Sequence, residues 1–518
     1  MPRFLELPRR YNAASHFIDR HLAEGRGDKV AIIDDRGSYT YAELAARVNR
    51  AGNLLKTQGV RPEQRVMLAL LDGIDFPAMF FGAMKIGAVP VPVNTLLTTP
   101  DYDFLLRDSR AAVLVVSDAL MEKFRPVISG QPCLQQVLIA GQVPPTVTPL
   151  AELLAAQPDE LEAADTTPDD IGFWLYSSGS TGMPKGAMHL QGDLVHTAVL
   201  YGEDVLGIRE DDVVFSAAKL FFAYGMGNAM TFPLHVGATA VLMAERPTPA
   251  AVMKRLKDHQ ASIFYGVPTL YAGILADRTV TKDSGSARLR RCVSAGEALP
   301  EDIGKRWEQL FGVEILDGIG STEMLHIFLS NRPGEVRYGS TGKAVPGYDL
   351  RVVGDDGRDV ATGEIGELLV SGPSCAVAYW NNRTKSLATF HGPWTRTGDK
   401  YVCDADGYYT YAGRSDDMLK VSGIWVSPFE VESALLAHPK VLEAAVVAHG
   451  DTDDLIKPKA YVVLQADIAG DEALVGELQL FVKDRLAPYK YPRWIEFVAE
   501  LPKTATGKIQ RFKLRVSA

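Results

Sequence analysis

Cysteine is scarce in this chain of 518 residues, with four in all, at positions 133, 292, 375 and 403. They lie far apart and form no C-x-x-C pair, and the ten histidines show no H-E-x-x-H spacing. A disulfide framework or a structural zinc site is therefore disfavoured, and a reducing compartment is favoured.

Long apolar runs are missing as well. No stretch approaches the roughly 18 uninterrupted apolar residues that a membrane helix needs. Residues 1–10 (MPRFLELPRR) lack the apolar core of a secretory signal. We therefore expect a soluble, cytoplasmic protein that has no membrane partner.

An excess of positive charge is also absent. The chain has 54 Lys and Arg against 64 Asp and Glu, a formal net charge of −10 and a pI of about 5.6. This balance argues against nucleic acid as a partner. An anionic ligand would have to be bound by local basic residues and backbone N–H groups. The length of 518 residues favours two or more domains.

Strand-like and helix-like segments alternate along the first part of the chain, which predicts a layered α/β architecture with mostly parallel strands. A capping box at residues 40–43 (TYAE) opens a helix that Gly59 ends, and a further helical stretch runs through Phe80 and Met84. Residues 131–168, rich in Pro, Ala and acid, are predicted to be a surface connection. The predicted strands are residues 29–33, 66–71, 89–93 and 112–116.

The pattern changes after Thr341, where short strands between Gly-rich turns predict a β-rich lobe. Residues 413–417 (GRSDD) form a polar break, and Ser427 begins a helix of the small domain beyond it. We place the boundary at Asp416. This predicts a large multi-lobed α/β domain over residues 1–415 and a small, mobile α+β domain over residues 416–518.

The most informative segment is the loop at residues 176–186 (YSSGSTGMPKG). Glycines let the backbone approach an anion closely, while N–H groups, hydroxyls and the Lys185 ammonium supply donors and charge. The apolar residues 171–176 predict a strand that leads into it. The loop lacks the Walker order G-x-x-x-x-G-K-[ST], because Gly186 follows Lys185. It indicates a polyphosphate site, with a polar surface turn as the alternative.

This loop resembles the phosphate loop of the adenylate-forming enzymes, which include acyl-CoA synthetases, aryl-CoA ligases, luciferases and peptide-synthetase adenylation domains. Further segments match this family's signatures in the family's order, over nearly the whole chain. The resemblance implies ATP, Mg²⁺ and coenzyme A as cofactors.

A second signature lies at residues 317–323 (DGIGSTE). A hydroxyl beside a carboxylate can hold an α-phosphate and Mg²⁺ together. By resemblance, Thr322 contacts the α-phosphate and Glu323 is the Mg²⁺ ligand, both with a catalytic role. The alternative is a strand-to-helix turn that Thr322 caps.

Other segments resemble the parts of the family that bind the adenosine of ATP. Residues 294–298 (SAGEA) and 317–319 resemble the two sides of the adenine site, and residues 397–399 (TGD) with Arg414 resemble the ribose site. A carboxylate suits two vicinal hydroxyls, although an isolated T-G-D is usually a turn. The resemblance assigns ATP or AMP binding to Ser177, Ser178, Gly179, Ser180, Thr181, Lys185, Gly296, Glu297, Ala298, Asp317, Gly318, Ile319, Thr322, Asp399 and Arg414.

The C-terminal signature, residues 502–508 (PKTATGK), ends in Lys508, which is catalytic by resemblance. An ammonium aimed at charge that develops on the α-phosphate stabilises the transition state more than the ground state. A basic tail is the alternative. Asp416 aligns with the family's hinge, with a solvated linker acid as the alternative. Gly423 and Trp425 are candidate walls of the coenzyme A tunnel.

The family's acyl pocket corresponds to residues 219–227 (KLFFAYGMG) and 324–327 (MLHI). The first segment has no Asp, which amino-acid-activating relatives carry, so an α-amino acid is disfavoured. Small residues beside flat side chains predict a slot for a planar ring. Phe221 is expected in the core, and His326 either faces the ring or is a core histidine. The expected lining residues are Phe222, Ala223, Tyr224, Gly320, His326 and Ile327.

These pocket segments, together with residues 421–428, resemble most closely those of benzoate–CoA ligases and their 4-hydroxybenzoate relatives. We expect an AMP-forming acid–thiol ligase that converts benzoate, or a close aryl acid, through an acyl-adenylate into benzoyl-CoA, with a role in aromatic compound degradation. Two other classes stay open: an enzyme that loads an aryl group onto a carrier protein, and a P-loop kinase or ATP-hydrolysing regulator, which residues 184–186 (PKG) disfavour. A catalytically silent AMP-binding protein is disfavoured further, because Lys508 and Glu323 are both present. A monomer or a homodimer is expected.

Overall fold

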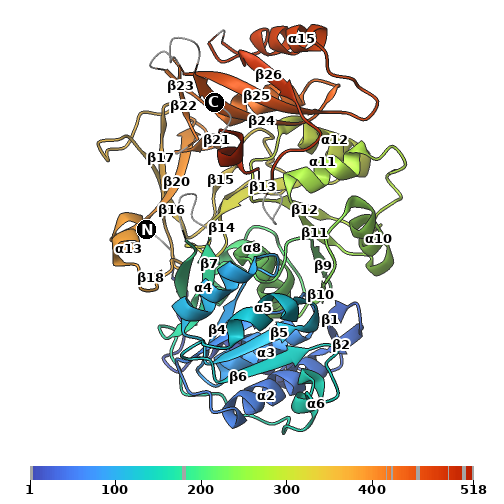
Figure 1. Ribbon diagram of the computed structural model, residues 1–518, viewed down its shortest axis with the longest axis vertical. Helices are drawn as coiled ribbons and strands as arrows, with labels where there is room; N and C mark the ends of the chain where they lie inside the picture. Colours follow the sequence, from blue (N-terminus) through green and yellow to red (C-terminus); the bar gives the residue numbers. More distant parts are fainter. Residues whose placement is uncertain are drawn as a thin grey trace.

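The computed structural model describes residues 4–177, 183–415, 417–421, 424–450, 456–487, 489–503 and 509–515. A large N-terminal domain forms the lower and middle parts of the molecule in Figure 1, and a smaller C-terminal domain, in deep orange to red, lies above it. This arrangement confirms the predicted combination of a large α/β domain with a small α+β domain.

The largest sheet runs through the middle of the N-terminal domain in the order β15-β14-β13-β12-β11-β9-β10-β1-β2. The pairs from β1 to β13 are parallel, and the pairs at both edges are antiparallel. The carboxyl ends of the central strands therefore meet at one edge, where ligands bind in open α/β sheets. The bounds are β1 Val30–Asp34, β2 Gly37–Thr40, β9 Val213–Ser216, β10 Thr239–Val241, β11 Ile263–Gly266, β12 Arg291–Ser294, β13 Ile315–Gly320, β14 Ile327–Ser330 and β15 Lys343–Ala344.

A second, wholly parallel sheet has the order β4-β3-β5-β6. Its central strands are continuous apolar runs, as expected for strands that are buried on both faces. The prediction of a surface connection over residues 131–168 is wrong in part, because this segment contains β6 and a helix, α6. The short apolar run of β6 is hidden in the sequence by its polar and Pro-rich flanks. The bounds are β3 Arg65–Ala69, β4 Val89–Pro92, β5 Val113–Ser117 and β6 Gln136–Ala140.

The helices of the N-terminal domain cover these sheets. The predicted capping box of α2 is confirmed, because Thr40 Oγ1 accepts from the Glu43 amide at 3.2 Å and Glu43 Oε2 accepts from the Thr40 amide at 2.8 Å. The bounds are η1 Ser15–Asp19, α1 Arg20–Ala23, α2 Tyr41–Thr57, α3 Asp75–Lys85, α4 Thr99–Ser109, η2 Asp118–Leu120, α5 Met121–Ile128, α6 Leu150–Ala155, α7 Asp193–Thr197, η3 Ala198–Glu203, α8 Ala223–Met226, η4 Gly227–Thr231, α9 Phe232–Val236, α10 Pro249–His259, α11 Pro268–Ala276 and α12 Glu301–Phe311.

The β-rich lobe that the sequence predicts after Thr341 is confirmed. It pairs β16, β17, β20, β19 and β21, and a small sheet of β7, β8 and β18 lies beside it. The strand predicted before the phosphate loop is β7. The bounds are β7 Ile171–Ser177, β8 Lys185–Leu190, β16 Asp349–Val353, β17 Ile365–Ser371, β18 Ala378–Tyr379, α13 Arg383–Thr389, β19 Phe390–His391, β20 Trp394–Cys403 and β21 Tyr409–Arg414.

The C-terminal domain has its own apolar core, which includes Val431, Val446, Val462 and Leu478. Its first helix begins as predicted, because Ser427 Oγ accepts from the Glu430 amide at 3.1 Å. The predicted boundary residue Asp416 lies outside the described residues. The bounds are β22 Leu419–Val421, β23 Ile424–Val426, α14 Pro428–Leu436, β24 Val441–Gly450, β25 Ile456–Leu464, α15 Glu472–Lys483, β26 Trp494–Phe497 and α16 Arg511–Leu514.

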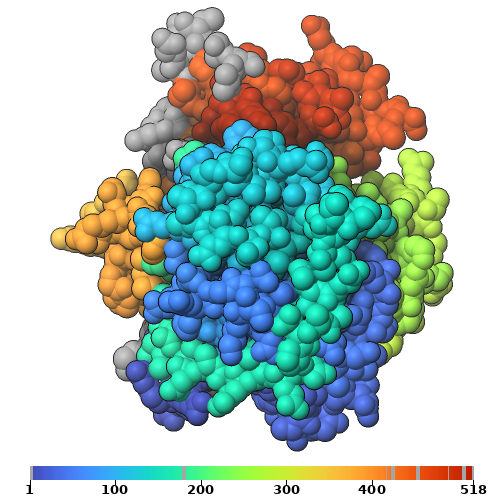
Figure 2. Space-filling view, turned by 60° about the horizontal axis from the view of Figure 1, so that its bottom comes forward, coloured from blue at the N-terminus to red at the C-terminus, as the bar shows by residue number. Residues whose placement is uncertain are grey.

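The C-terminal domain lies against one end of the N-terminal domain (Figures 1 and 2). Residues of α11 and α12 and residues from the end of α14, the start of β24 and Gln465 line the two sides of a narrow cleft of about 20 Å³. Among the described residues, no helix is both long and apolar enough to cross a membrane.

Candidate active site

The strands β7 and β8 bring the two ends of the predicted phosphate loop together. Ser177, the last residue of β7, is the Cα partner of Lys185, the first residue of β8. The loop residues Ser178, Gly179, Ser180 and Thr181 lie outside the described residues. The antiparallel pair therefore positions two of the predicted phosphate-binding side chains, Ser177 and Lys185, at one end of a hairpin.

The carboxylate of Glu323 lies at these loop ends. Its Oε1 accepts hydrogen bonds from Tyr379 Oη at 2.7 Å and from Ser177 Oγ at 3.3 Å. Lys185 Nζ lies 3.5 Å from Tyr379 Oη and 4.5 Å from the centre of the Tyr379 ring. Burial and the neighbouring Glu323 charge raise the pKa of Tyr379, so its hydroxyl stays a donor. Glu323 is thus oriented by hydroxyls beside a cation.

The backbone of residues 322–323 is held by hydrogen bonds, one of them to a buried histidine that also contacts a buried carboxylate. His189 Nε2 lies 2.8 Å from the Thr322 carbonyl oxygen, and His189 Nδ1 lies 2.9 Å from Asp193 Oδ2. The Ala376 amide donates to the Glu323 carbonyl at 2.7 Å. The chain continues from β13 through turns into the antiparallel strand β14, so the alternative reading of Thr322 as a helix cap is wrong.

The two segments predicted to flank adenine lie on neighbouring strands. Ser294, which ends β12, is the Cα partner of Asp317 in β13. Ser294 Oγ and Asp317 Oδ1 are both buried and have no hydrogen-bond partner among the described residues. Burial raises the pKa of Asp317 well above its usual value. Buried polar atoms without partners are rare, so they mark this edge of the sheet as a place for a polar ligand.

The turn that follows β12 carries Gly296 and continues into α12. Gly296 has a φ of +96°, a backbone conformation that residues other than glycine rarely adopt. Glu297 and Ala298 follow it and are half-buried. Gly318 and Ile319 lie in β13, where they pair with β14.

The predicted ribose residues are brought together by the β20–β21 hairpin. Asp399 and Arg414 are Cα partners, and Arg414 Nη1 lies 3.2 Å from Asp399 Oδ1. Arg414 Nη1 also donates to the Thr397 carbonyl at 3.0 Å. Gly398, which precedes Asp399 in β20, has a φ of +73°, and a Cβ atom there would lie 2.9 Å from Arg414 Nη2. This position in the strand thus requires glycine both for its backbone and for the space that the guanidinium fills.

His326 is buried among aromatic rings at the predicted acyl pocket. Its ring centre lies 5.7 Å from that of Tyr224 and 4.5 Å from that of Phe232. Its Nε2 lies 3.3 Å from the Tyr224 carbonyl oxygen, which can only accept, and 3.1 Å from Asn228 Oδ1. The proton is therefore on Nε2. Burial lowers the pKa of His326 to about 3, so the ring is neutral at physiological pH.

The remaining predicted pocket residues lie on two elements. Phe222 precedes α8, and Ala223 and Tyr224 form its first turn, all three half-buried. The Tyr224 hydroxyl lies 3.2 Å from the carbonyl oxygens of Gly266 and Val293, so the side chain points from α8 toward the large sheet. The other two residues, Gly320 and Ile327, are Cα partners between β13 and β14. Phe221 is buried in the core, as expected.

Several predicted residues belong to the segments that the structure does not describe: Lys508, Asp416 and Gly423. Trp425 lies in β23. Ile509, which follows Lys508 in the sequence, is described, and its amide donates to Glu297 Oε1 at 2.9 Å. The residue that follows the C-terminal signature therefore lies beside the segment that is predicted to flank adenine.

Some site residues are not indicated by the sequence. Tyr379 lies 56 positions from Glu323 in the chain, and no motif connects the two. The same holds for His189, which lies 133 positions before Thr322. Gly227 differs from these two, because it ends the predicted pocket segment 219–227 and a glycine inside a helical segment is a signal of close packing. A Cβ atom there would lie 2.3 Å from His326 Cδ2.

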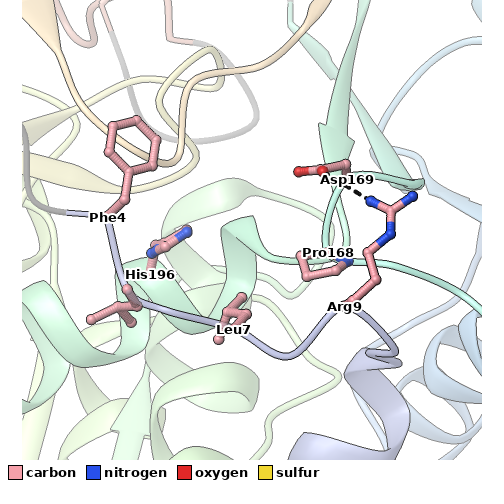
Figure 3. A pocket seen from close by; sticks show the side chains of 7 residues that line it. Phe4, Leu7, Arg9, Pro168, Asp169 and His196 are labelled. Atoms are coloured by element: carbon pink, nitrogen blue, oxygen red, sulfur yellow. Dashed lines mark ion pairs between the residues drawn. The ribbon is translucent and has the colours of Figure 1, made fainter.

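A larger surface pocket, of about 320 Å³, lies elsewhere, under the N-terminal segment (Figure 3). An exposed ion pair of Arg9 and Asp169 lies at its rim with 3.7 Å between nitrogen and oxygen. None of the predicted site residues lines it. The lining residues are Phe4, Leu5, Leu7, Arg9, Pro168, Asp169 and His196.

The oxygen ligands at Glu323 fit Mg²⁺. No group of three or more His, Cys, Asp or Glu residues that could hold a metal occurs within the described part of the chain. Mg²⁺ is commonly held by one or two carboxylates together with the phosphates of a substrate. Glu323 supplies one carboxylate, and it lies next to the ends of the predicted phosphate loop.

Comparison with known proteins finds matches along nearly the full length of the chain. Residues 19–380 match the family described as AMP-binding enzyme, and residues 430–508 match the AMP-binding enzyme C-terminal domain. A benzoate–CoA ligase of Thauera aromatica is 62% identical over 99% of this chain and 97% of its own. A 4-hydroxybenzoate–CoA/benzoate–CoA ligase of Rhodopseudomonas palustris is 52% identical over 98% of this chain and 94% of its own.

A solved structure is similar as well. The crystal structure of a benzoate CoA ligase from Burkholderia xenovorans superposes with a TM-score of 0.91, at 52% identity, and the match covers 98% of this chain and 100% of that one. The matched domains, the high identity and the shared fold lead to one conclusion: this chain belongs to the AMP-binding enzyme family.

Proposed function

We propose that this protein is an ATP-dependent benzoate–CoA ligase that forms benzoyl-CoA, AMP and pyrophosphate. The observation that carries the reaction class is the convergence of Ser177, Lys185 and Glu323 at the ends of the β7–β8 loop. The acid is inferred from the relatives that are named as benzoate–CoA ligases at 62% and 52% identity over nearly the full chain.

In the first step, a carboxylate oxygen of benzoate attacks the α-phosphorus of ATP. The bond from the α-phosphorus to the bridging oxygen breaks, and pyrophosphate leaves with the electron pair. Lys185 and Lys508 stabilise the negative charge on the phosphates, and Thr322 contacts the α-phosphate. Glu323 would hold Mg²⁺, which would supply Lewis-acid stabilisation of this charge. Asp399 accepts from the ribose hydroxyls and is held in place by Arg414.

In the second step, the thiol sulfur of coenzyme A attacks the acyl carbonyl of benzoyl-adenylate and loses its proton. The bond between the acyl carbon and the phosphate oxygen breaks, and AMP leaves. Rotation of the C-terminal domain about Asp416 removes Lys508 and exposes a tunnel at Gly423 and Trp425 to the pantetheine arm. No covalent enzyme intermediate is needed, because the adenylate is itself an activated acyl donor.

Neutral His326 suits an apolar ring better than a charged residue would. It is packed among Tyr224, Phe232 and Tyr201, with ring centres between 4.5 and 5.7 Å away. Together with Phe222, Ala223, Gly320 and Ile327, it forms a flat, mostly apolar binding site for benzoate. A 4-hydroxybenzoate ligase is the second candidate, because the Rhodopseudomonas palustris relative is named for both acids.

A panel of acids tests the proposal. Purified protein is incubated with ATP and each of benzoate, 4-hydroxybenzoate, 2-aminobenzoate, hexanoate and phenylalanine, with and without coenzyme A, and AMP and ADP are measured. We expect AMP release with coenzyme A to be fastest for benzoate. A preference for hexanoate would refute the aryl assignment, and ADP as the product would refute the reaction class. Faster turnover of 4-hydroxybenzoate would favour the second candidate.

Three features stay predictions at this stage: the Mg²⁺ requirement, the cytoplasmic location, and a monomeric or homodimeric state. The metal requirement is checked in the same assay by chelation and re-addition of Mg²⁺.

A further inference from the structure

A hydrogen bond joins Ile509, the residue after the C-terminal signature, to the N-terminal domain. The Ile509 amide donates to Glu297 Oε1 at 2.9 Å, across 212 positions of sequence. Glu297 lies between β12 and α12, and α12 also faces the C-terminal domain across the narrow cleft. Both residues are half-buried. The contact therefore lies at the edge of a larger interface between the domains.

The segment around Ile509 is fixed within its own domain. Lys503 and Ile509 form an antiparallel bridge, and the Gln510 amide donates to the Pro502 carbonyl at 2.7 Å. Arg511 forms a two-pronged ion pair with Glu432, at 2.7 Å from Nη2 to Oε2 and 3.1 Å from Nε to Oε1. Ile509 is thus tied to the C-terminal domain and moves with it.

Two charged side chains of this segment, Lys503 and Arg511, have partners within the C-terminal domain. Lys503 Nζ lies 2.6 Å from Glu443 Oε1, and Arg511 is bound to Glu432. At Ile509 the donor toward the N-terminal domain is a backbone amide. A carboxylate that accepts from a backbone N–H forms a charge-assisted bond with a definite direction. Glu297 therefore contacts the main chain of the residue that follows Lys508, and this contact does not depend on which side chain stands at position 509.

We propose that Glu297 is a docking residue that holds the C-terminal domain in the orientation needed for adenylation, and that it acts through the placement of the Lys508 segment. This inference rests on the proposed two-step function, in which Lys508 acts in the first step. It differs from the sequence-based expectation, which assigned Glu297 to ATP binding. The second step uses no charge from Lys508, so it should not depend on this contact.

The experiment compares Glu297→Ala with Glu297→Gln in two separate half-reactions. Pyrophosphate release from benzoate and ATP without coenzyme A measures adenylation, and benzoyl-CoA formation from supplied benzoyl-adenylate measures the second step. Loss of a hydrogen bond to a charged group predicts adenylation about 10-fold to 100-fold slower in Glu297→Ala. The Gln variant keeps a carbonyl acceptor and should recover most of the rate. The second step and the Kd of ATP should equal those of the wild type.

Two reference variants make the result specific. Glu301→Ala removes a carboxylate at the start of α12 that pairs with Lys305 on its own helix, and it should behave as the wild type. Lys508→Ala should lose adenylation more severely than Glu297→Ala. If Lys508→Ala adenylates normally, the mechanism in the proposed function fails and the docking role fails with it. If Lys508→Ala is slow but Glu297→Ala is not, the docking role alone is refuted.

Other results also decide the matter. A raised Kd of ATP in Glu297→Ala would make Glu297 a nucleotide contact, and equal slowing of both steps would make it a general structural residue; either refutes docking. Amide hydrogen exchange gives an independent measurement. The Ile509 amide should lose protection in Glu297→Ala, whereas the Gln510 amide, bonded to Pro502, should keep it. If Glu297→Ala does not fold, Glu297→Asp, with its carboxylate withdrawn by one methylene, should show the same slowed adenylation.

Discussion

At the scale of single residues, the site is built from side chains that are positioned by a second group. Glu323 is held by Tyr379 and Ser177, and Asp399 is held by Arg414. In both cases a carboxylate that is expected to meet a ligand already has one oxygen engaged. Such prior orientation lowers the entropy lost when the ligand binds.

Tyr379→Phe tests this positioning at Glu323. The variant keeps the ring over which Lys185 lies but removes the hydroxyl that donates to Glu323. We expect adenylation to fall about 10-fold or more, because a hydrogen bond to a charged group is lost. The Mg²⁺ concentration for half-maximal rate should rise. Binding of Mn²⁺ with ATP, followed by electron paramagnetic resonance, should weaken in parallel.

The matched control is Tyr102→Phe. It also removes a single hydroxyl, which donates to the Asn94 carbonyl at 2.8 Å, in a different part of the N-terminal domain. Its metal dependence should be that of the wild type. An unchanged metal requirement in Tyr379→Phe would show that the hydroxyl does not position Glu323.

At the scale of elements, the β20–β21 hairpin shows how local geometry places ligand-binding groups. The antiparallel register places Asp399 opposite Arg414, and Gly398 in β20 leaves space for the guanidinium. A second glycine in the same hairpin, Gly407, has a similar φ of +79°, but nothing lies within 4 Å of a Cβ built there. A substitution at Gly407 therefore tests backbone strain alone, whereas the same substitution at Gly398 tests backbone strain together with crowding against Arg414.

The prediction compares Gly398→Ala with Gly407→Ala. Both variants should lose about 1 kcal/mol or more of stability, because alanine is strained at positive φ. Only Gly398→Ala should also raise the KM of ATP, since its Cβ would displace Arg414 from Asp399. Thermal melting and initial rates at varied ATP measure the two effects. Equal KM values in the two variants would contradict the role of Gly398 in nucleotide binding.

At the scale of the whole molecule, buried histidines make stability depend on pH. Burial lowers the pKa of His16 to about 3, of His21 to about 4 and of His326 to about 3, against about 6.5 in an unfolded chain. The unfolded state therefore binds more protons between these values, so stability falls as the pH drops below about 6.5. Burial raises the pKa of Asp72 to about 6, which acts in the opposite direction.

His326→Gln isolates the contribution of His326 to this pH dependence, because the wild type and the variant share Asp72 and the other histidines. Between pH 6 and pH 4, the wild type should lose stability relative to the variant by about 1.4 kcal/mol per pH unit. Urea unfolding at stepped pH without ligands, followed by tryptophan fluorescence, gives the comparison. Parallel stability profiles would mean that His326 is already protonated in the folded protein.

The sequence by itself determines the local elements and the identity of the chemical groups. The α2 cap, the parallel apolar strands and the helix start at Ser427 depend on neighbours within a few positions, so their residues specify them directly. The signatures around Lys185, Glu323 and Asp399 are also short. Their order along the chain is enough to recognise the family, because each signature is a short run of residue types that can be read without knowing the fold.

The tertiary structure decides which of these groups meet. Tyr379 reaches Glu323 across 56 positions, and Ile509 reaches Glu297 across 212. Such contacts depend on strand pairing and domain packing, which no short motif encodes. The same reason explains β6, whose short apolar run becomes a strand because β5 offers it an edge. Sequence specified the chemistry of the site, and long-range packing specified its geometry.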